Sequence, residues 1–189
     1  MTLAFNSLQK RTIQEVLEWH EFQVEILGGE KNHVLEELGA APASEDSRFL
    51  EMTRGEIDAF FVVQQNELGF AAMLLLMAAA EAAIRVDFID RVEKRLKDPV
   101  SKAFRAINKK LAKRNAPDRV SLEEDILDTW AEIDDNAKGP IGEFKGALRM
   151  RHWLAHGRYW DVRMGRQRYT PDDVFDISSN LLQALALRT

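Results

Sequence analysis

Apolar residues recur along almost the whole chain at intervals of three and four positions. This spacing is typical of helices that bury one face. It predicts about six to seven helices, at residues 13–38, 47–66, 71–97, 100–114, 121–136, 141–158 and 171–187. No internal repeat and no long linker divides the chain. We therefore expect one all-α domain, a helical bundle that covers residues 1–189.

Turn and capping residues predict where several of these helices begin and end. Ser121 to Glu124 has the pattern of a capping box, and Thr170 to Asp173 places proline and acidic residues directly after a capping threonine. The Asp98-Pro99 pair should end the helix before it. Gly69 is expected to interrupt the helical pattern, and Lys138 to Pro140 is expected to form a turn.

The segment from Ala71 to Lys97 is expected to form the long central helix. Its first half is rich in alanine, leucine and methionine and is apolar all round, as a helix surrounded by other helices should be. The longest apolar run, Leu68 to Ile84, contains Glu81 and is shorter than the ~20 residues of a membrane span. A buried core helix is the better interpretation, and no membrane association is expected.

The ends and the composition of the chain suggest where it resides. The first twenty residues lack the charged, apolar and small-residue regions of a signal peptide. The chain has no cysteine, so it has neither disulfides nor a cysteine-based zinc site. Both observations are compatible with a cytoplasmic protein.

Charge is distributed unevenly, although the formal net charge is only −5. Arg91 to Arg119 has eleven Lys/Arg against three acidic residues, and Lys145 to Arg168 has seven against one. Such a chain can bind phosphate on one surface while it stays acidic overall. For the first block, solvated helix faces are an equally good interpretation.

Histidines and arginines gather in one helical segment, Arg149 to Trp160. On a helix, its side chains Arg149, His152 and His156 share an arc roughly 60° wide with Lys145. Imidazoles can exchange protons near neutral pH, and guanidinium groups can bind phosphate and stabilise developing negative charge. This combination suits RNA cleavage, in which the 2′-hydroxyl loses a proton and the 5′-oxygen gains one, without a metal or another cofactor.

The six residues Arg151-His-Trp-Leu-Ala-His156 resemble the signature of the HEPN superfamily. That signature has an arginine, a polar residue, three variable residues and a histidine. The glycine that follows, Gly157, is also typical, and the alanine-rich helix with Glu81 resembles the corresponding HEPN helix. Only the six-residue motif is diagnostic, although the helical pattern agrees over most of the chain.

The resemblance implies a fold, an assembly and an activity. HEPN domains are helical bundles that commonly dimerise with their motifs facing each other, and active members are metal-independent ribonucleases, many of them toxins or phage-defence proteins. Carried over, Arg151 and His156 are the expected catalytic pair and His152 the supporting polar residue. RNA, a second copy of the chain and an antitoxin protein are the expected partners. The side chains expected to bind RNA are Lys145, Arg149, Arg158, Tyr159, Arg163 and Arg166.

Several alternatives remain open from the sequence. On an ideal helix Arg151 lies roughly 140° from His156, so Arg149 competes for the role of the catalytic arginine. The i, i+4 spacing of His152 and His156 also occurs in metal sites, but no carboxylate shares their arc. The domain can also be a non-catalytic HEPN-like RNA-binding, nucleotide-binding or adaptor domain. A helical interaction module that matches the motif by chance is a third hypothesis.

Overall fold

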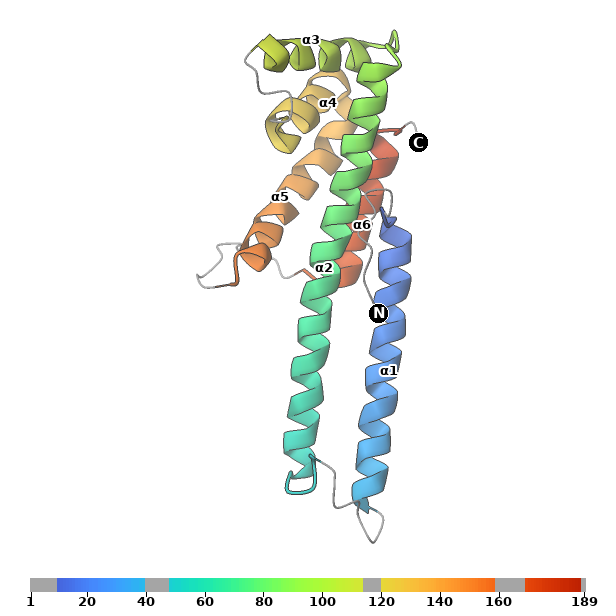
Figure 1. Cartoon of the computed structure of the whole chain (residues 1–189), viewed down its shortest axis with the longest axis vertical. Coiled ribbons are helices and arrows are strands. Elements are labelled where there is room, and N and C mark those ends of the chain that lie inside the picture. The colour runs from blue at the N-terminus through green and yellow to red at the C-terminus, as the bar shows by residue number, and fades with distance from the viewer. Residues whose placement is uncertain (1–9, 40–47, 114–119, 159–168, 188–189) are drawn as a thin grey trace.

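The computed structural model describes residues 10–39, 48–113, 120–158 and 169–187. These residues form six α-helices, one π-helical turn and one 3-10 turn, and they contain no strand (Figure 1). The prediction of an all-α fold with a long central helix is therefore confirmed. The elements are α1 (Ile13–Gly39), α2 (Arg54–Glu93), α3 (Pro99–Lys113), η1 (Leu122–Leu127), α4 (Asp128–Ile133), η2 (Asp135–Ala137), α5 (Lys138–Ala155) and α6 (Pro171–Ala184).

The central helix α2 is longer than predicted, because it runs through Gly69 without a break. A glycine within a helix costs only about 1 kcal/mol relative to alanine, and packing against α1, α5 and α6 outweighs that cost. A Cβ atom at position 69 would lie 3.7 Å from Cγ of Pro171, so α6 begins close against α2 at this point.

The most apolar part of α2 forms the core of the bundle. Leu76, Met77 and Ala80 are completely buried there. Among the described helices, α2 is also the one that is long and apolar enough to cross a membrane, by length and composition only. The buried core helix of a bundle meets the same criterion.

The lower parts of α1 and α2 form a hairpin that extends beyond the other helices (Figure 1). A small separate apolar cluster holds the hairpin together, and its buried members are Val34, Phe49, Ile57 and Phe61. An ion pair of 2.7 Å between Lys31 and Asp58 also joins the two helices. The hairpin therefore has its own local core, away from the main one.

At the other end of α2, the buried side chain of Arg91 links α2 to residues at the start of α3, in α4 and just after α6. Arg91 is 3% exposed and pairs with Asp87 on the previous turn of α2 and with Asp98, the residue before α3. Its guanidinium carbon lies 4.8 Å from the ring centroid of Trp130, and a terminal nitrogen lies 3.5 Å from the carbonyl oxygen of Ala186. Arg91, which belongs to the first basic block of the sequence, is therefore buried instead of facing solvent.

Asp98 also caps the first turn of α3. Its carboxylate accepts hydrogen bonds from the backbone N–H and the hydroxyl of Ser101. Burial favours the protonated form, but these bonds and the charge of Arg91 outweigh it and lower the pKa of Asp98. A carboxylate with a lowered pKa stabilises the fold near neutral pH, and that stabilisation is lost as the pH falls through the lowered value.

Side-chain caps mark several helix starts. The helix predicted from residue 47 begins later, because Thr53 caps α2 at Arg54. Thr170 caps α6 as predicted, and Thr170 and Asp173 exchange the two hydrogen bonds of a capping box. Ser121 accepts the predicted hydrogen bond from the N–H of Glu124. In the second bond the N–H of Ser121 donates to the carboxylate of Asp125, not to that of Glu124. The predicted turn at Lys138 to Pro140 is wrong: α5 begins there, and Pro140 lies in the first turn, where a missing N–H is tolerated.

Candidate functional site

The candidate site lies on α5, whose two sides differ sharply. One side is buried in the core and consists of Ile141, Phe144, Ala147, Leu148 and Met150. Arg149, His152 and His156 are exposed on the other side, and Lys145 is half-buried there. The arc of basic and imidazole side chains predicted from the helical spacing is therefore present at the surface.

The two histidines of the motif are neighbours on this surface. The ring centroids of His152 and His156 lie 4.3 Å apart, and the ring planes are tilted by 56°. His156 is the residue that ends the helix, and its backbone N–H donates to the carbonyl oxygen of His152 at 3.1 Å. The two rings are therefore close enough to contact the same bound ligand.

Gly157 ends α5 three residues earlier than the sequence predicted. Its φ of +81° is a left-handed conformation that disfavours residues with a Cβ atom. Its N–H donates to the carbonyl of Leu154, and the N–H of Arg158 donates to the carbonyl of Trp153. These two bonds make a Schellman motif. The glycine of the motif thus has a structural role, which is to end the helix immediately after His156.

Arg151 does not share the histidine surface. Its terminal nitrogen lies 3.0 Å from a carboxylate oxygen of Glu81 on α2. Neither that oxygen nor Nε of Arg151 makes a hydrogen bond within the described residues. The contact between Arg151 and Glu81 is therefore a salt bridge without a hydrogen bond. The other oxygen of Glu81 accepts a hydrogen bond of 2.8 Å from Arg85. Glu81, noted in the sequence only for its place in the alanine-rich helix, therefore contacts the arginine of the motif.

Arg149 lies on the histidine side of α5, near a tyrosine that the sequence did not indicate. Burial raises the pKa of Tyr169, and the positive charge of Arg149 opposes that rise. A Cβ atom on Gly146, one turn before Arg149, would lie 3.4 Å from the Tyr169 hydroxyl. No sequence pattern could identify Tyr169, because the tertiary structure alone brings the start of α6 to α5.

Two further residues predicted to bind RNA already form ion pairs with carboxylates. Lys145 contacts Asp128 at 2.6 Å. Arg158 donates two hydrogen bonds of 2.8 Å to Glu67, and this pairing raises the pKa of Arg158. Both side chains must exchange a carboxylate for a phosphate before they can bind RNA.

Aromatic packing occupies the region beside Arg158. Its guanidinium lies 4.9 Å from the ring centroid of Phe70, which makes an edge contact of 6.2 Å with Trp153. Trp153 therefore packs against α2. The predicted binding residues Tyr159, Arg163 and Arg166 lie outside the described residues, as does Trp160.

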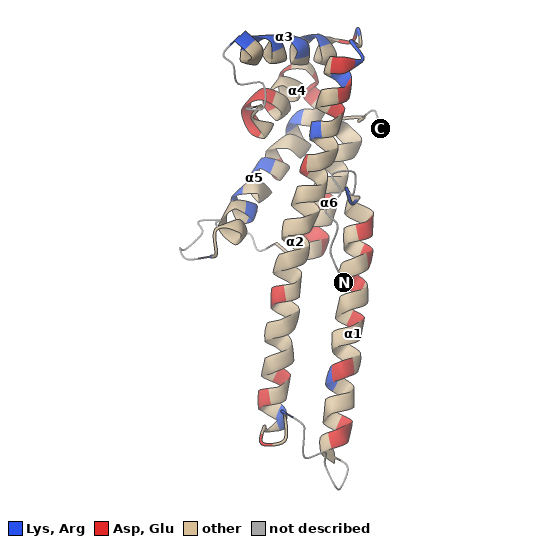
Figure 2. Cartoon of the chain, viewed as in Figure 1, with Lys and Arg blue, Asp and Glu red and all other residues tan. Residues whose placement is uncertain are grey.

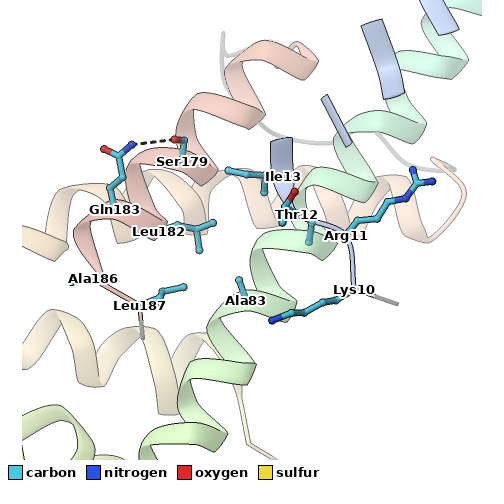
Figure 3. A pocket seen from close by; sticks show the side chains of 11 residues that line it. Lys10, Arg11, Thr12, Ile13, Ala83, Ser179, Leu182, Gln183, Ala186 and Leu187 are labelled. Atoms are coloured by element: carbon cyan, nitrogen blue, oxygen red, sulfur yellow. Dashed lines mark hydrogen bonds between the residues drawn. The ribbon is translucent and has the colours of Figure 1, made fainter. Parts of the chain in front are cut away.

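A cavity of about 520 Å³ elsewhere in the molecule contains none of these groups. It lies between the beginning of α1, the middle of α2 and the end of α6, and Ala83, Leu182 and Leu187 line its apolar wall (Figure 3). Lys10 and Arg11 stand at its edge. The cavity has no histidine and no carboxylate among its described lining residues, so the reactive groups remain those of α5.

The described residues contain no group of three or more histidine, aspartate or glutamate side chains placed to hold a metal ion. The chemistry that the exposed side of α5 can support is proton transfer by the two imidazoles and phosphate binding by Arg149. Comparisons with protein-family models, curated proteins and solved structures found no match.

Proposed function

We propose that the protein is a metal-independent endoribonuclease of the HEPN type, a toxin or phage-defence component that acts in the cytoplasm. One observation carries the proposal. The imidazoles of His152 and His156 lie 4.3 Å apart on an exposed helix face that also presents Arg149. The resemblance of Arg151 to His156 to the HEPN signature supports it, and an antitoxin protein is the partner to expect.

Cleavage on this face requires two proton transfers around one phosphate. One imidazole accepts the proton of the 2′-hydroxyl as its oxygen attacks phosphorus, and a protonated imidazole donates to the departing 5′-oxygen. The products are a 2′,3′-cyclic phosphate and a 5′-hydroxyl. We assign the main acid–base role to His156, whereas His152 orients it or shares the transfer. A guanidinium stabilises the charge of the phosphorane.

The structure distinguishes the two candidate arginines by their partners. Arg149 is exposed beside the histidines, whereas Arg151 is paired with Glu81 and is 37% exposed. We therefore expect Arg149→Ala to lower kcat roughly a hundredfold, as loss of a donor to the transition state does, with the urea midpoint unchanged. Arg151→Ala should lower the free energy of unfolding by about 1 kcal/mol or less, because its ion pair is partly solvated. Single-turnover cleavage and urea titration measure both.

A larger loss of kcat in Arg151→Ala than in Arg149→Ala would reverse this assignment. It would mean that Arg151 leaves Glu81 when RNA binds, or that it serves the motif of a second protomer. Glu81→Gln, which removes the carboxylate charge but keeps the size of the side chain, separates these cases. It should raise the cleavage rate if Glu81 competes with phosphate for Arg151.

We also propose a homodimer that brings two copies of α5 close together. Ala71, Leu75 and Ala78 share one exposed face of α2, on the turns just before Glu81, and Leu75 is 40% exposed. An apolar stripe beside the motif can supply contacts that offset repulsion between two basic helices. Leu75→Asp should therefore convert a dimer to a monomer in light scattering at micromolar concentration, with the helical circular dichroism unchanged.

Val62→Asp is the matched control for the dimer, because Val62 is also an exposed apolar residue of α2, at 51%, but lies in the projecting hairpin. It should leave the mass unchanged. A wild-type protein that is monomeric at these concentrations would contradict the proposed dimer, and cleavage by that monomer would show that one chain suffices.

The alternative is a HEPN-like domain that binds RNA or a nucleotide, or acts as an adaptor, without cleavage. The ion pair between Glu81 and Arg151 favours this alternative, because it engages the arginine that the motif assigns to catalysis. It predicts binding of RNA by wild type together with unchanged RNA length after long incubation. Cleavage in the presence of EDTA that disappears in His156→Ala distinguishes the enzyme from the binding domain.

A further inference from the structure

Helix α3 is the most uniformly basic element of the described chain. Its fifteen residues, Pro99 to Lys113, include five lysines and arginines and no acidic residue. Figure 2 shows its Lys and Arg residues in blue along the helix, which lies across the end of α2. Basic side chains this concentrated produce a strong local positive potential, even on a protein whose net charge is negative.

Three of the four lysines of α3 form a line on its solvent side. Lys102, Lys109 and Lys113 are exposed and lie at i, i+7 and i+11, within an arc of about 40°. They extend over about 16 Å along the helix. The exposed Ala106 lies between them on the same side. None of these three lysines forms an ion pair with a residue that the structure describes.

The apolar side of α3 is already occupied. Val100 and Phe104 are buried in the main core, and the ring of Phe104 lies 4.8 Å from that of Phe88 and 6.4 Å from that of Trp130. A helix that inserts into a membrane surface needs a free apolar side. Since α3 has none, its lysines can act only through charge, on a ligand that presents a row of negative groups.

We propose that the Lys102–Lys109–Lys113 face of α3 binds the phosphodiester backbone of a nucleic acid, separately from the site on α5. Three phosphates along a strand can pair with a line of three lysines, and such contacts require no particular base sequence. α3 crosses one end of the molecule (Figure 1). His156 caps the C-terminus of α5, and this end of α5 points away from α3. The face therefore provides a second point of attachment for a long strand.

Binding to α3 needs only backbone phosphates, so the inference does not depend on cleavage at α5. The probe is accordingly a single-stranded 2′-O-methyl RNA, which has no free 2′-hydroxyl and is not cleaved by the proposed mechanism. For single strands, the slope of log K against log salt changes by about 0.7 for each phosphate contact. The Lys102→Ala/Lys109→Ala/Lys113→Ala variant should therefore bind several-fold more weakly and reduce the slope by about 2.

A matched control removes three positive charges from another part of the surface. Lys10 and Arg11 are exposed in the segment before α1, and Arg54 is exposed as the first residue of α2. Their triple alanine variant should keep the salt slope within about half a unit of wild type. The triple arginine variant at positions 102, 109 and 113 keeps the charges and should bind as wild type does.

Ala106 allows a test in the opposite direction. Ala106→Lys adds a fourth charge to the line and should increase the slope by about 0.7, whereas Ala106→Glu should weaken binding. Both residues are good helix formers, so α3 should persist. Circular dichroism and the thermal midpoint check the fold of every variant.

A DNA strand of the same sequence should show the same slope, because the backbone charge is the same. Equal binding by wild type and the α3 triple alanine variant would overturn the inference. So would an equal loss in the control triple variant, or an absence of binding by wild type. Tighter α3-dependent binding to anionic phospholipid vesicles than to RNA would instead assign the face to a membrane.

Discussion

Replacing His156 by alanine should lower the rate of RNA cleavage by roughly a hundredfold or more, the loss expected when a general acid–base group is removed. The fold should persist, because the side chain is exposed at the end of α5. The rate is measured on a labelled RNA at saturating enzyme in a buffer that contains EDTA. The wild type should be equally active with and without the chelator and should leave 2′,3′-cyclic phosphate ends.

His33→Ala is a suitable control for His156→Ala. His33 is exposed on α1, where it contacts Glu37 at 3.4 Å, and it belongs to the hairpin that projects away from α5. This variant should cleave as the wild type does. A DNA strand of the same sequence should survive with every variant, since it lacks the attacking hydroxyl. Full activity in a purified His156→Ala/Arg151→Ala variant would show that α5 does not carry the active site.

Replacing Arg91 by alanine should cost about 3–5 kcal/mol in the free energy of unfolding, the largest effect on stability that we expect from a single polar residue. The side chain joins Asp87, Asp98 and the carbonyl of Ala186, and it covers the face of Trp130. Its removal deprives the carboxylate of Asp87, which is 1% exposed, of this ion pair. Urea unfolding followed by circular dichroism measures the loss.

Two further variants test whether loss of the buried ion pair is the cause. Asp87→Leu/Arg91→Met removes both charges and should be less destabilised than Arg91→Ala, because the pair is then replaced by apolar side chains and not broken on one side. Lys94, at the C-terminal end of α2, forms a more exposed ion pair with Asp90. Lys94→Ala breaks that pair and should lower the free energy of unfolding by less than about 1 kcal/mol. A double variant as unstable as the single one would mean that packing by the arginine stem, and not charge, holds the helices together.

The sequence predicts the helices well because their periodicity and caps are local. The capping pattern at Thr170 specifies the start of α6 correctly, because its two hydrogen bonds join residues three positions apart. The predicted break at Gly69 and the predicted turn at Lys138 to Pro140 are wrong. α2 continues through Gly69, and α5 begins at Lys138, because packing outweighs the cost of one glycine and a proline is tolerated in the first turn.

The same locality explains which part of the candidate site the sequence determined by itself. One helix carries Arg149, His152 and His156, and a rotation of 100° per residue is enough to place them on one exposed face. The ion pairs of Arg151 with Glu81 and of Arg158 with Glu67 join residues 70 and 91 positions apart. Only the tertiary structure brings the members of these pairs together. It therefore also decides which lysine and arginine side chains are available to bind phosphate. It also decided the burial of Arg91, because a charged side chain can be buried only where other helices supply its partners.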